Sequence, residues 1–208
     1  MPVNIGDATV AMNEVLTKYG PFLDPSVLSK VRQMPVGKIY RILSQAEYTP
    51  YFNSVFKNFF AAINVVALGG IKKMIDLAKT ATDAAPAIAC PAFTAPAVNV
   101  TDRVIYVNAD ANISIGTLYH EFVHFLEHGN FYPEFYSLGG NNPKILEGVT
   151  EYLTREVNAN VKAERMREGK YKAFLDETMN RAWDAPPFSA TTRMIQVAFR
   201  GDMSSLPT

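Results

Sequence analysis

The sequence predicts an α+β protein that is mostly helical, with a small antiparallel or mixed sheet at one edge. Apolar residues recur at helical spacing along most of the chain. Residues 103–108 have the β-branched and aromatic composition of a strand, and a strongly apolar helical stretch follows them. With 208 residues, 48% of them hydrophobic, the chain can bury one sizeable core. We therefore expect a single domain over residues 1–208, with a helical N-terminal part at 1–84 and a second part at 85–208.

The N-terminal part is predicted to begin with two short helices. The first covers residues 7–19, where Asp7 can cap its start and Gly20 with the proline after it ends it. The second covers residues 25–34, because Asp24 is a favourable N-cap and a proline suits the first helical turn.

A longer helical stretch follows a short ambiguous segment. Residues 38–43 fit a strand and a helix equally well. Residues 46–81 have helical periodicity, with a break at Gly69-Gly70. Aromatic residues on one side of a helix usually belong to the core, and we expect this of Phe52, Phe56, Phe59 and Phe60.

The small sheet is predicted after about residue 82. Residues 85–99 are rich in proline and alanine, and residues 103–108 form the best strand in the sequence. A hairpin over about residues 96–108 is expected. Prolines in the flanking segment place it at a sheet edge or make it irregular, because proline cannot donate a hydrogen bond to a neighbouring strand.

The strand leads into a helix that is apolar nearly all round and is therefore expected to be buried. Asn112 or Ser114 is its expected N-cap. The helix should run to about His128, where Gly129 is a natural residue to follow a helix end.

Three more helices are predicted in the remaining chain. Asn142 caps the first, which has a proline at its first position and ends near residue 157. Ser189 or Thr191 starts the last, which ends near Arg200. The helix between them covers residues 158–182 and is expected to face solvent, given its charged residues Lys162, Glu164, Arg165, Arg167, Glu168 and Lys170.

Composition excludes several classes of partner. Lys+Arg and Asp+Glu are 20 each, so the charge balance favours neither nucleic acid nor an anionic membrane as a partner.

The single cysteine, Cys90, cannot form an internal disulfide. The first residues lack the basic and apolar regions of a signal peptide. The expected location is the cytoplasm of the producing cell, or outside it after export without an N-terminal signal peptide.

The buried helix carries the motif His120-Glu121-x-x-His124. This spacing places two imidazoles one turn apart on one helix face, where both can bind one Zn²⁺. Glu121 can then reach a zinc-bound water and take its proton. Unpaired buried polar groups cost a few kcal/mol, on the order of 2–7 in transfer measurements, and a metal with its water would satisfy all three side chains.

A third ligand is expected on the next helix, where Glu147 and Glu151 lie at i and i+4 on one face. Two like charges at this spacing repel each other unless a positive group lies near them. A Zn²⁺ with its imidazoles would be that group. Gly148 costs about 1 kcal/mol relative to alanine in a helix, so we expect it to allow close packing against the helix that carries the histidines.

These motifs together resemble the gluzincin branch of the zincin metallopeptidases, which includes thermolysin and a group of aminopeptidases. The resemblance implies a zincin-like fold, with residues 85–208 as the zinc-binding catalytic part. It implies that Zn²⁺ is the cofactor and that its ligands are His120, His124 and Glu147. It further implies that Glu121 is the general base and that Glu151 orients a ligand histidine from outside the metal shell.

The resemblance covers about residues 103–157. Glu147-Gly148 followed by Tyr152 is similar to the Asn-Glu-Gly-Phe-Ala type of third-ligand helix. The sequence departs from the family pattern in two respects. The spacer of residues 125–146 is longer than in those two groups, and Glu151 stands where an aspartate is commoner.

Several alternatives remain open at this stage. Glu151 could be the ligand in place of Glu147, and the two histidines could be ordinary buried side chains without a metal. His128 could be a ligand, although its ordinary role would be to interact with the dipole at a helix C-terminus. Cys90 could cap the zinc as a thiolate, although a lone buried cysteine is far commoner. The letters of Arg200-Gly201-Asp202 match an adhesion tripeptide, and a turn is the default.

The function expected from these residues is zinc-dependent hydrolysis of peptide bonds, with a peptide or protein substrate. A donor to the developing oxyanion is also needed, and the candidates by position are Tyr132, Tyr136, His128 and Arg193. A small peptidase of this kind suits a delivered bacterial effector or toxin, whose partners would include an inhibitor or immunity protein. A housekeeping peptidase fits the residues equally well. The alternative class is a zinc-binding pseudoenzyme or a structural or interaction module without hydrolytic activity.

Overall fold

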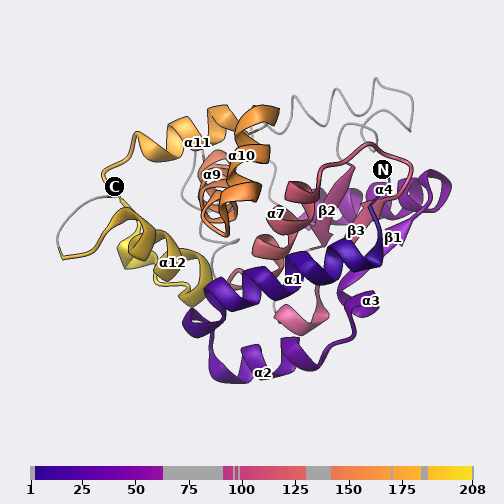
Figure 1. Ribbon diagram of the computed structural model, residues 1–208, viewed down its shortest axis with the longest axis horizontal. Helices are drawn as coiled ribbons and strands as arrows, with labels where there is room; N and C mark the ends of the chain where they lie inside the picture. The colour runs from indigo at the N-terminus through magenta and orange to yellow at the C-terminus, as the bar shows by residue number, and fades with distance from the viewer. Residues whose placement is uncertain are drawn as a thin grey trace.

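The computed structural model describes most of the chain. The described residues are 3–62, 91–95, 97, 99–129, 142–169, 171–183 and 187–207, with the side chains of 55–62 and 142–144 left aside. Helices predominate and surround one small sheet (Figure 1). The α+β prediction is confirmed at this level. The predicted boundary at residue 84 lies outside the described residues.

The two N-terminal helices form where the caps predict them. Helix α1 (Ile5–Tyr19) begins two residues earlier than expected because Asn4 is its N-cap. Asp7, predicted as the cap, instead accepts a hydrogen bond from the amide of Asn4 at 2.9 Å, which completes a capping box. Helix α2 (Pro25–Gln33) is capped by Asp24, as predicted.

The sheet is mixed and has the strand order β1-β3-β2. The ambiguous segment near residue 40 is one helical turn, α3 (Val36–Ile39), followed by strand β1 (Tyr40–Leu43). Strand β3 (Val104–Asn108) is central and pairs parallel with β1 and antiparallel with β2 (Ala92–Ala95). The predicted hairpin is therefore present, but its first strand lies earlier than residue 96.

Side chains of β2 alternate between the two faces of the sheet. Phe93 packs in an aromatic cluster with Tyr48 and Phe52 from helix α4 (Gln45–Ala62). Phe52 is buried, as predicted. The side chains of Phe56, Phe59 and Phe60, the predicted break at Gly69-Gly70 and Cys90 lie outside the described residues.

Helix α7 (Ile115–Leu126) lies at the centre of the molecule, between the sheet and the helices of the C-terminal half (Figure 1). Every residue of α7 after Ile115 is buried, as the apolar pattern predicts. The helix ends two residues before the predicted His128, because the backbone at Glu127 turns to an extended conformation with φ −58° and ψ 143°. Gly129 therefore does not follow the helix end, and that prediction is wrong.

Within its described residues, the C-terminal half holds four helices, which are α9 (Asn142–Arg155), α10 (Ala159–Glu168), α11 (Lys172–Met179) and α12 (Ala190–Arg200). The single helix predicted over residues 158–182 is wrong. Gly169 and Tyr171 have φ of 61° and 62°, and this left-handed backbone separates α10 from α11. Helix α12 is capped by Ser189, one of the two starts that the sequence allows.

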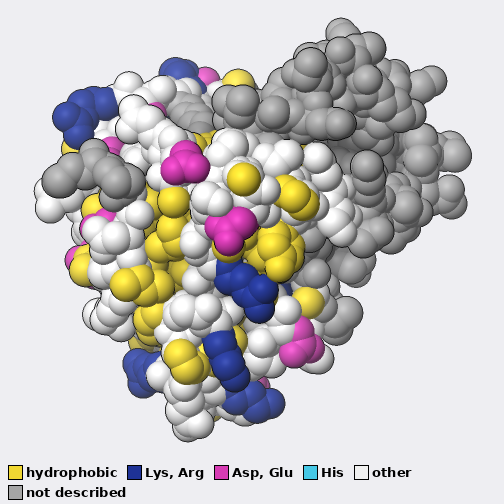
Figure 2. Space-filling model, turned by 90° about the vertical axis from the view of Figure 1, so that its right-hand side faces the viewer, with side chains coloured by type: hydrophobic (Ala, Val, Ile, Leu, Met, Phe, Trp, Pro, Cys, Tyr) yellow, Lys and Arg dark blue, Asp and Glu magenta, His cyan; other side chains and the backbone are white. Residues whose placement is uncertain are grey.

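One hydrophobic core joins these parts, with residues from α1, the sheet, α7, α9 and α12. Within the described residues, no helix is long and apolar enough to cross a membrane. On the face seen in Figure 2, the described acidic and basic side chains are interspersed among apolar ones, as the balanced composition predicts.

Candidate metal centre

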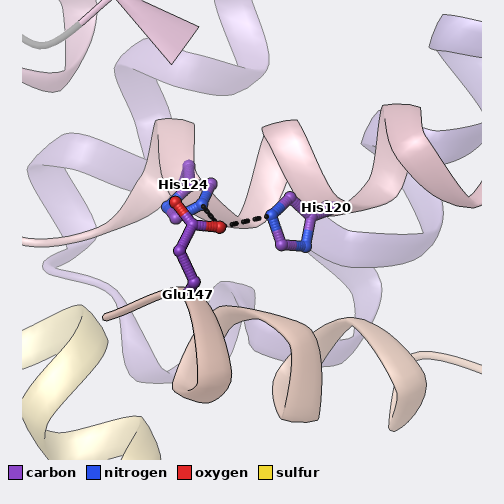
Figure 3. A group of neighbouring side chains, drawn as sticks. All are labelled: His120, His124 and Glu147. Carbon is purple, nitrogen blue, oxygen red and sulfur yellow. Dashed lines mark hydrogen bonds and ion pairs between the residues drawn. The ribbon is translucent and has the colours of Figure 1, made fainter. Parts of the chain in front are cut away.

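Helices α7 and α9 bring three predicted ligands together. His120 and His124 lie one turn apart on α7, and Glu147 reaches up between them from α9 (Figure 3). Glu147 Oε2 is 3.2 Å from His120 Nε2 and 3.4 Å from His124 Nε2. One ligand atom from each residue lies within 4.8 Å of the other two.

The two separations from Glu147 to the imidazoles are compatible with a tetrahedral zinc ion. Ligand atoms at about 2.0–2.1 Å from Zn²⁺ lie about 3.3 Å from one another when the geometry is tetrahedral. The two distances from Glu147 to the imidazoles, 3.2 and 3.4 Å, bracket that value. The His120 and His124 side chains are 1% and 7% exposed, whereas Glu147 is 31% exposed, so water reaches the group from the side of Glu147.

Charge favours a cation between the three side chains. Burial acts to raise the pKa of Glu147, but the neighbouring His124 and His120 hold it well below its ordinary value. Burial acts to lower the pKa of His124, but Glu127 and Glu147 hold it well above its ordinary value. A positive charge is therefore favoured between these side chains, and a metal cation would supply one.

Glu151 lies on the other side of the His120 ring, with its Oε2 3.3 Å from Nδ1. This is the place predicted for a residue that orients a ligand histidine. The alternative in which Glu151 replaces Glu147 as a ligand does not fit, because its carboxylate faces Nδ1 and not the Nε2 side where Glu147 lies.

Two arginines neutralise Glu151. Arg155 donates to it at 2.8 Å, and Arg165 donates through Nη2 at 2.5 Å. Burial raises the pKa of Glu151, but His120 and Arg165 lower it to about 2. The prediction that Arg165 faces solvent is wrong, since it is fully buried where α10 crosses the start of α7. Arg155 could have been found from its i+4 spacing to Glu151.

His124 has an equivalent partner that sequence reasoning missed. Glu127 is fully buried, and its Oε2 lies 2.9 Å from His124 Nδ1. The hydroxyl of Thr150 on α9 donates to the other oxygen of Glu127. The i+3 spacing of Glu127 from His124 was a readable signal, because residues three apart in a helix are neighbours. Both candidate ligand histidines thus have a buried carboxylate at Nδ1, as metal-binding histidines commonly do.

Arg103 closes the C-terminal end of α7. Its Nη1 lies 2.8 Å from the carbonyl of Phe125 and 2.5 Å from that of Glu127, and its Nε donates to Ala97 at 2.9 Å. The last carbonyls of a helix have no partner within it, so a buried cation there satisfies them. The side chain of Arg103 thereby joins the β2–β3 connection to the helix that carries the histidines.

Glu121, the predicted general base, is 5% exposed. Thr94 on β2 lies against it, with Oγ1 2.9 Å from the carboxylate Oε2 and 2.8 Å from the main-chain carbonyl of the same residue.

Tyr171 covers the face of His120. The two rings are nearly parallel, at 29°, with centroids 4.5 Å apart. Its left-handed backbone, at φ 62°, costs a non-glycine residue on the order of 1 kcal/mol or more. The guanidinium carbon of Arg165 lies 5.1 Å from the Tyr171 ring centroid, so one arginine contacts both the carboxylate and the aromatic ring that flank His120. No sequence pattern indicates this contact.

Gly148 does permit close helix packing, but the predicted partner helix is wrong. A Cβ at Gly148 would lie 1.9 Å from Thr178 Oγ1 and 2.4 Å from the carbonyl oxygen of Phe174. Both residues belong to α11 and not to the histidine helix. Gly148 therefore allows α11 to pack closely against α9 at the residue that follows Glu147.

The other candidates fall outside this group. His128 lies against Gly201, where a Cβ would be 2.3 Å from its Nδ1, and it is not among the clustered ligand atoms. Arg200 is the last residue of α12, and Gly201 is its left-handed C-cap. Asp202 caps the short 3-10 helix that follows and accepts from the amide of Ser204 at 3.2 Å. Arg193 lies in the first turn of α12. Tyr132, Tyr136 and Cys90 are not among the described residues.

No protein-family model, curated protein or solved structure matches this chain.

Proposed function

We propose that this protein is a zinc-dependent metallopeptidase. The observation that carries the proposal is the convergence of His120, His124 and Glu147, in which Glu147 Oε2 lies 3.2 and 3.4 Å from the two imidazole Nε2 atoms. Two imidazoles and one carboxylate are the donor set of a catalytic zinc, which keeps a fourth position for water or substrate. A bound zinc would supply Lewis acidity toward the scissile carbonyl and would bring the pKa of its water toward about 7.

The protein's own residues would supply the proton transfer. Glu121 follows the first ligand in the helix and is the general base of the proposal. Its carboxylate takes a proton from the attacking water and passes it to the leaving amine. Glu127 is hydrogen-bonded to His124 Nδ1 at 2.9 Å, and the Glu151 carboxylate lies 3.3 Å from His120 Nδ1, so the acidic groups lie on the Nδ1 side of both rings and Glu147 lies on the Nε2 side.

We propose an extended peptide as the substrate. Within the described part of the chain, β2 packs against α7, which places Thr94 of β2 beside Glu121 of α7.

The proposal is tested by metal content and turnover together. We expect one zinc per chain and chelator-sensitive cleavage of a peptide library. Glu147→Ala should lose zinc, and Glu121→Gln should keep zinc but slow cleavage by roughly 10²–10⁴-fold, the usual contribution of a general base. Asp176→Asn, at an exposed carboxylate on α11, is the control and should change neither.

Each contrary outcome identifies a different error. A wild-type protein that binds no zinc would identify the group as buried histidines paired with carboxylates. Zinc binding without cleavage of any peptide would favour the pseudoenzyme or structural module. Full activity in Glu121→Gln would mean that another group is the base.

A further inference from the structure

We propose that Thr94 is the positioning residue of Glu121. The inference rests on the proposed function, in which Glu121 is the general base. Thr94 lies on β2, 27 residues before the base in the chain. It belongs to neither sequence motif.

The Thr94 hydroxyl lies between two hydrogen-bond acceptors that belong to Glu121. Thr94 Oγ1 lies 2.9 Å from Glu121 Oε2 and 2.8 Å from Glu121 O. A hydroxyl has one proton to donate and can turn it toward either acceptor. Because Glu121 is 5% exposed, its carboxylate depends on protein donors more than an exposed one would.

The hydrogen bond from Thr94 to Oε2 limits the rotation of the Glu121 carboxylate. Oε1 is then the oxygen that we assign to the attacking water.

The strand holds Thr94 in place for this role. Ala92 belongs to the main core with α7, and Thr94 lies two residues later on the same face of β2. Thr94 is paired with Ile105 in the centre of the sheet.

Valine at this position keeps the shape and removes the hydroxyl. We expect Thr94→Val to bind one zinc per chain and to keep KM within about twofold, while kcat falls roughly 10- to 100-fold, as it does when a catalytic group is misplaced by about 1 Å. Thr94→Ser should recover kcat to within about threefold, because serine restores the hydroxyl. Thr154→Val is the matched control, since Thr154 is buried and donates to the carbonyl of Thr150 at 2.7 Å. It should lower stability and leave kcat unchanged.

A double variant separates positioning from a general structural effect. Thr94→Val added to Glu121→Gln should slow the residual reaction by less than about twofold, because coupled residues are not additive. Wild-type kcat in Thr94→Val, or a Thr94→Ser variant as slow as Thr94→Val, would overturn this inference alone. An inactive wild-type protein, or an active Glu121→Gln variant, would overturn the proposed function and this inference with it.

Discussion

Replacing Gly148 with alanine is expected to destabilise the protein, although alanine is the better helix former by about 1 kcal/mol. The new methyl group would lie 1.9 Å from Thr178 Oγ1 and 2.4 Å from the carbonyl oxygen of Phe174. The threonine side chain can turn away, but the carbonyl belongs to the backbone of α11. Ordinary contact begins at 3.4 Å, so α9 and α11 must separate by about 1 Å.

The net effect follows from two opposing contributions. Overpacking of this kind costs about 1–3 kcal/mol, and a contact with backbone belongs at the upper end. After the gain in helix propensity, we expect the free energy of unfolding to fall by about 2 kcal/mol, or roughly 4–8 °C in Tm for a domain of this size. Glu147 precedes Gly148, so its carboxylate shifts as well, and zinc affinity should fall about tenfold.

The assay is urea denaturation in the presence of a chelator, which removes the contribution of zinc binding to stability. Gly37→Ala is the control, because Gly37 is exposed and a Cβ there would meet nothing within 4 Å. It should leave stability unchanged or raise it. Adding Thr178→Ala to Gly148→Ala should recover only part of the loss, since Phe174 remains. A Gly148→Ala variant as stable as wild type would refute the reasoning.

Two further predictions concern charge. Arg165→Met removes a fully buried cation from Glu151 and should lower the free energy of unfolding by about 3 kcal/mol, measured by urea denaturation in the presence of a chelator. The control, Lys172→Met at an exposed ion pair, should change it little. Equal losses in the two variants would contradict the assigned pairing. The metal-free protein should be most stable between about pH 4.5 and pH 6.5, which are the ordinary pKa values of glutamate and histidine. Because the pKa of His124 is raised in the folded protein, its contribution to stability is complete below pH 6.5 and is lost as the pH rises. Because the pKa of Glu147 is lowered, its contribution is complete above pH 4.5 and is lost as the pH falls. Bound zinc should remove the loss of stability at high pH, because zinc binds the neutral imidazole and releases about one proton. A stability that does not vary with pH in the metal-free protein would contradict this assignment.

Local patterns located the three clustered side chains. The i, i+4 spacing of His120 and His124 and the face shared by Glu147 and Glu151 depend only on helical geometry, which the chain specifies over a few residues. Caps at Asp24 and Ser189 were readable for the same reason. Two predicted helix boundaries were wrong for local reasons. Helix α7 ends at Leu126, and the left-handed backbone of Gly169 and Tyr171 divides the helix predicted over residues 158–182.

The residues that surround the site could not be read in this way. Arg165, Arg103 and Thr94 contact Glu151, the end of α7 and Glu121 from segments far away in the chain. Each of these contacts requires a particular crossing of helices or a particular strand beside α7. Surface charge and buried charge look alike in a sequence, so Arg165 was assigned to solvent.

The sequence by itself determined which residues have the chemistry for a zinc site and which helix faces present them, because both depend on residue type and short spacing. Only the tertiary structure decided that Glu147 meets Nε2 and Glu151 meets Nδ1, that Gly148 packs on α11, and that buried arginines and Thr94 hold the acidic groups. The physical reason is that these choices depend on how helices and strands pack, and packing is settled by contacts between residues distant in the chain.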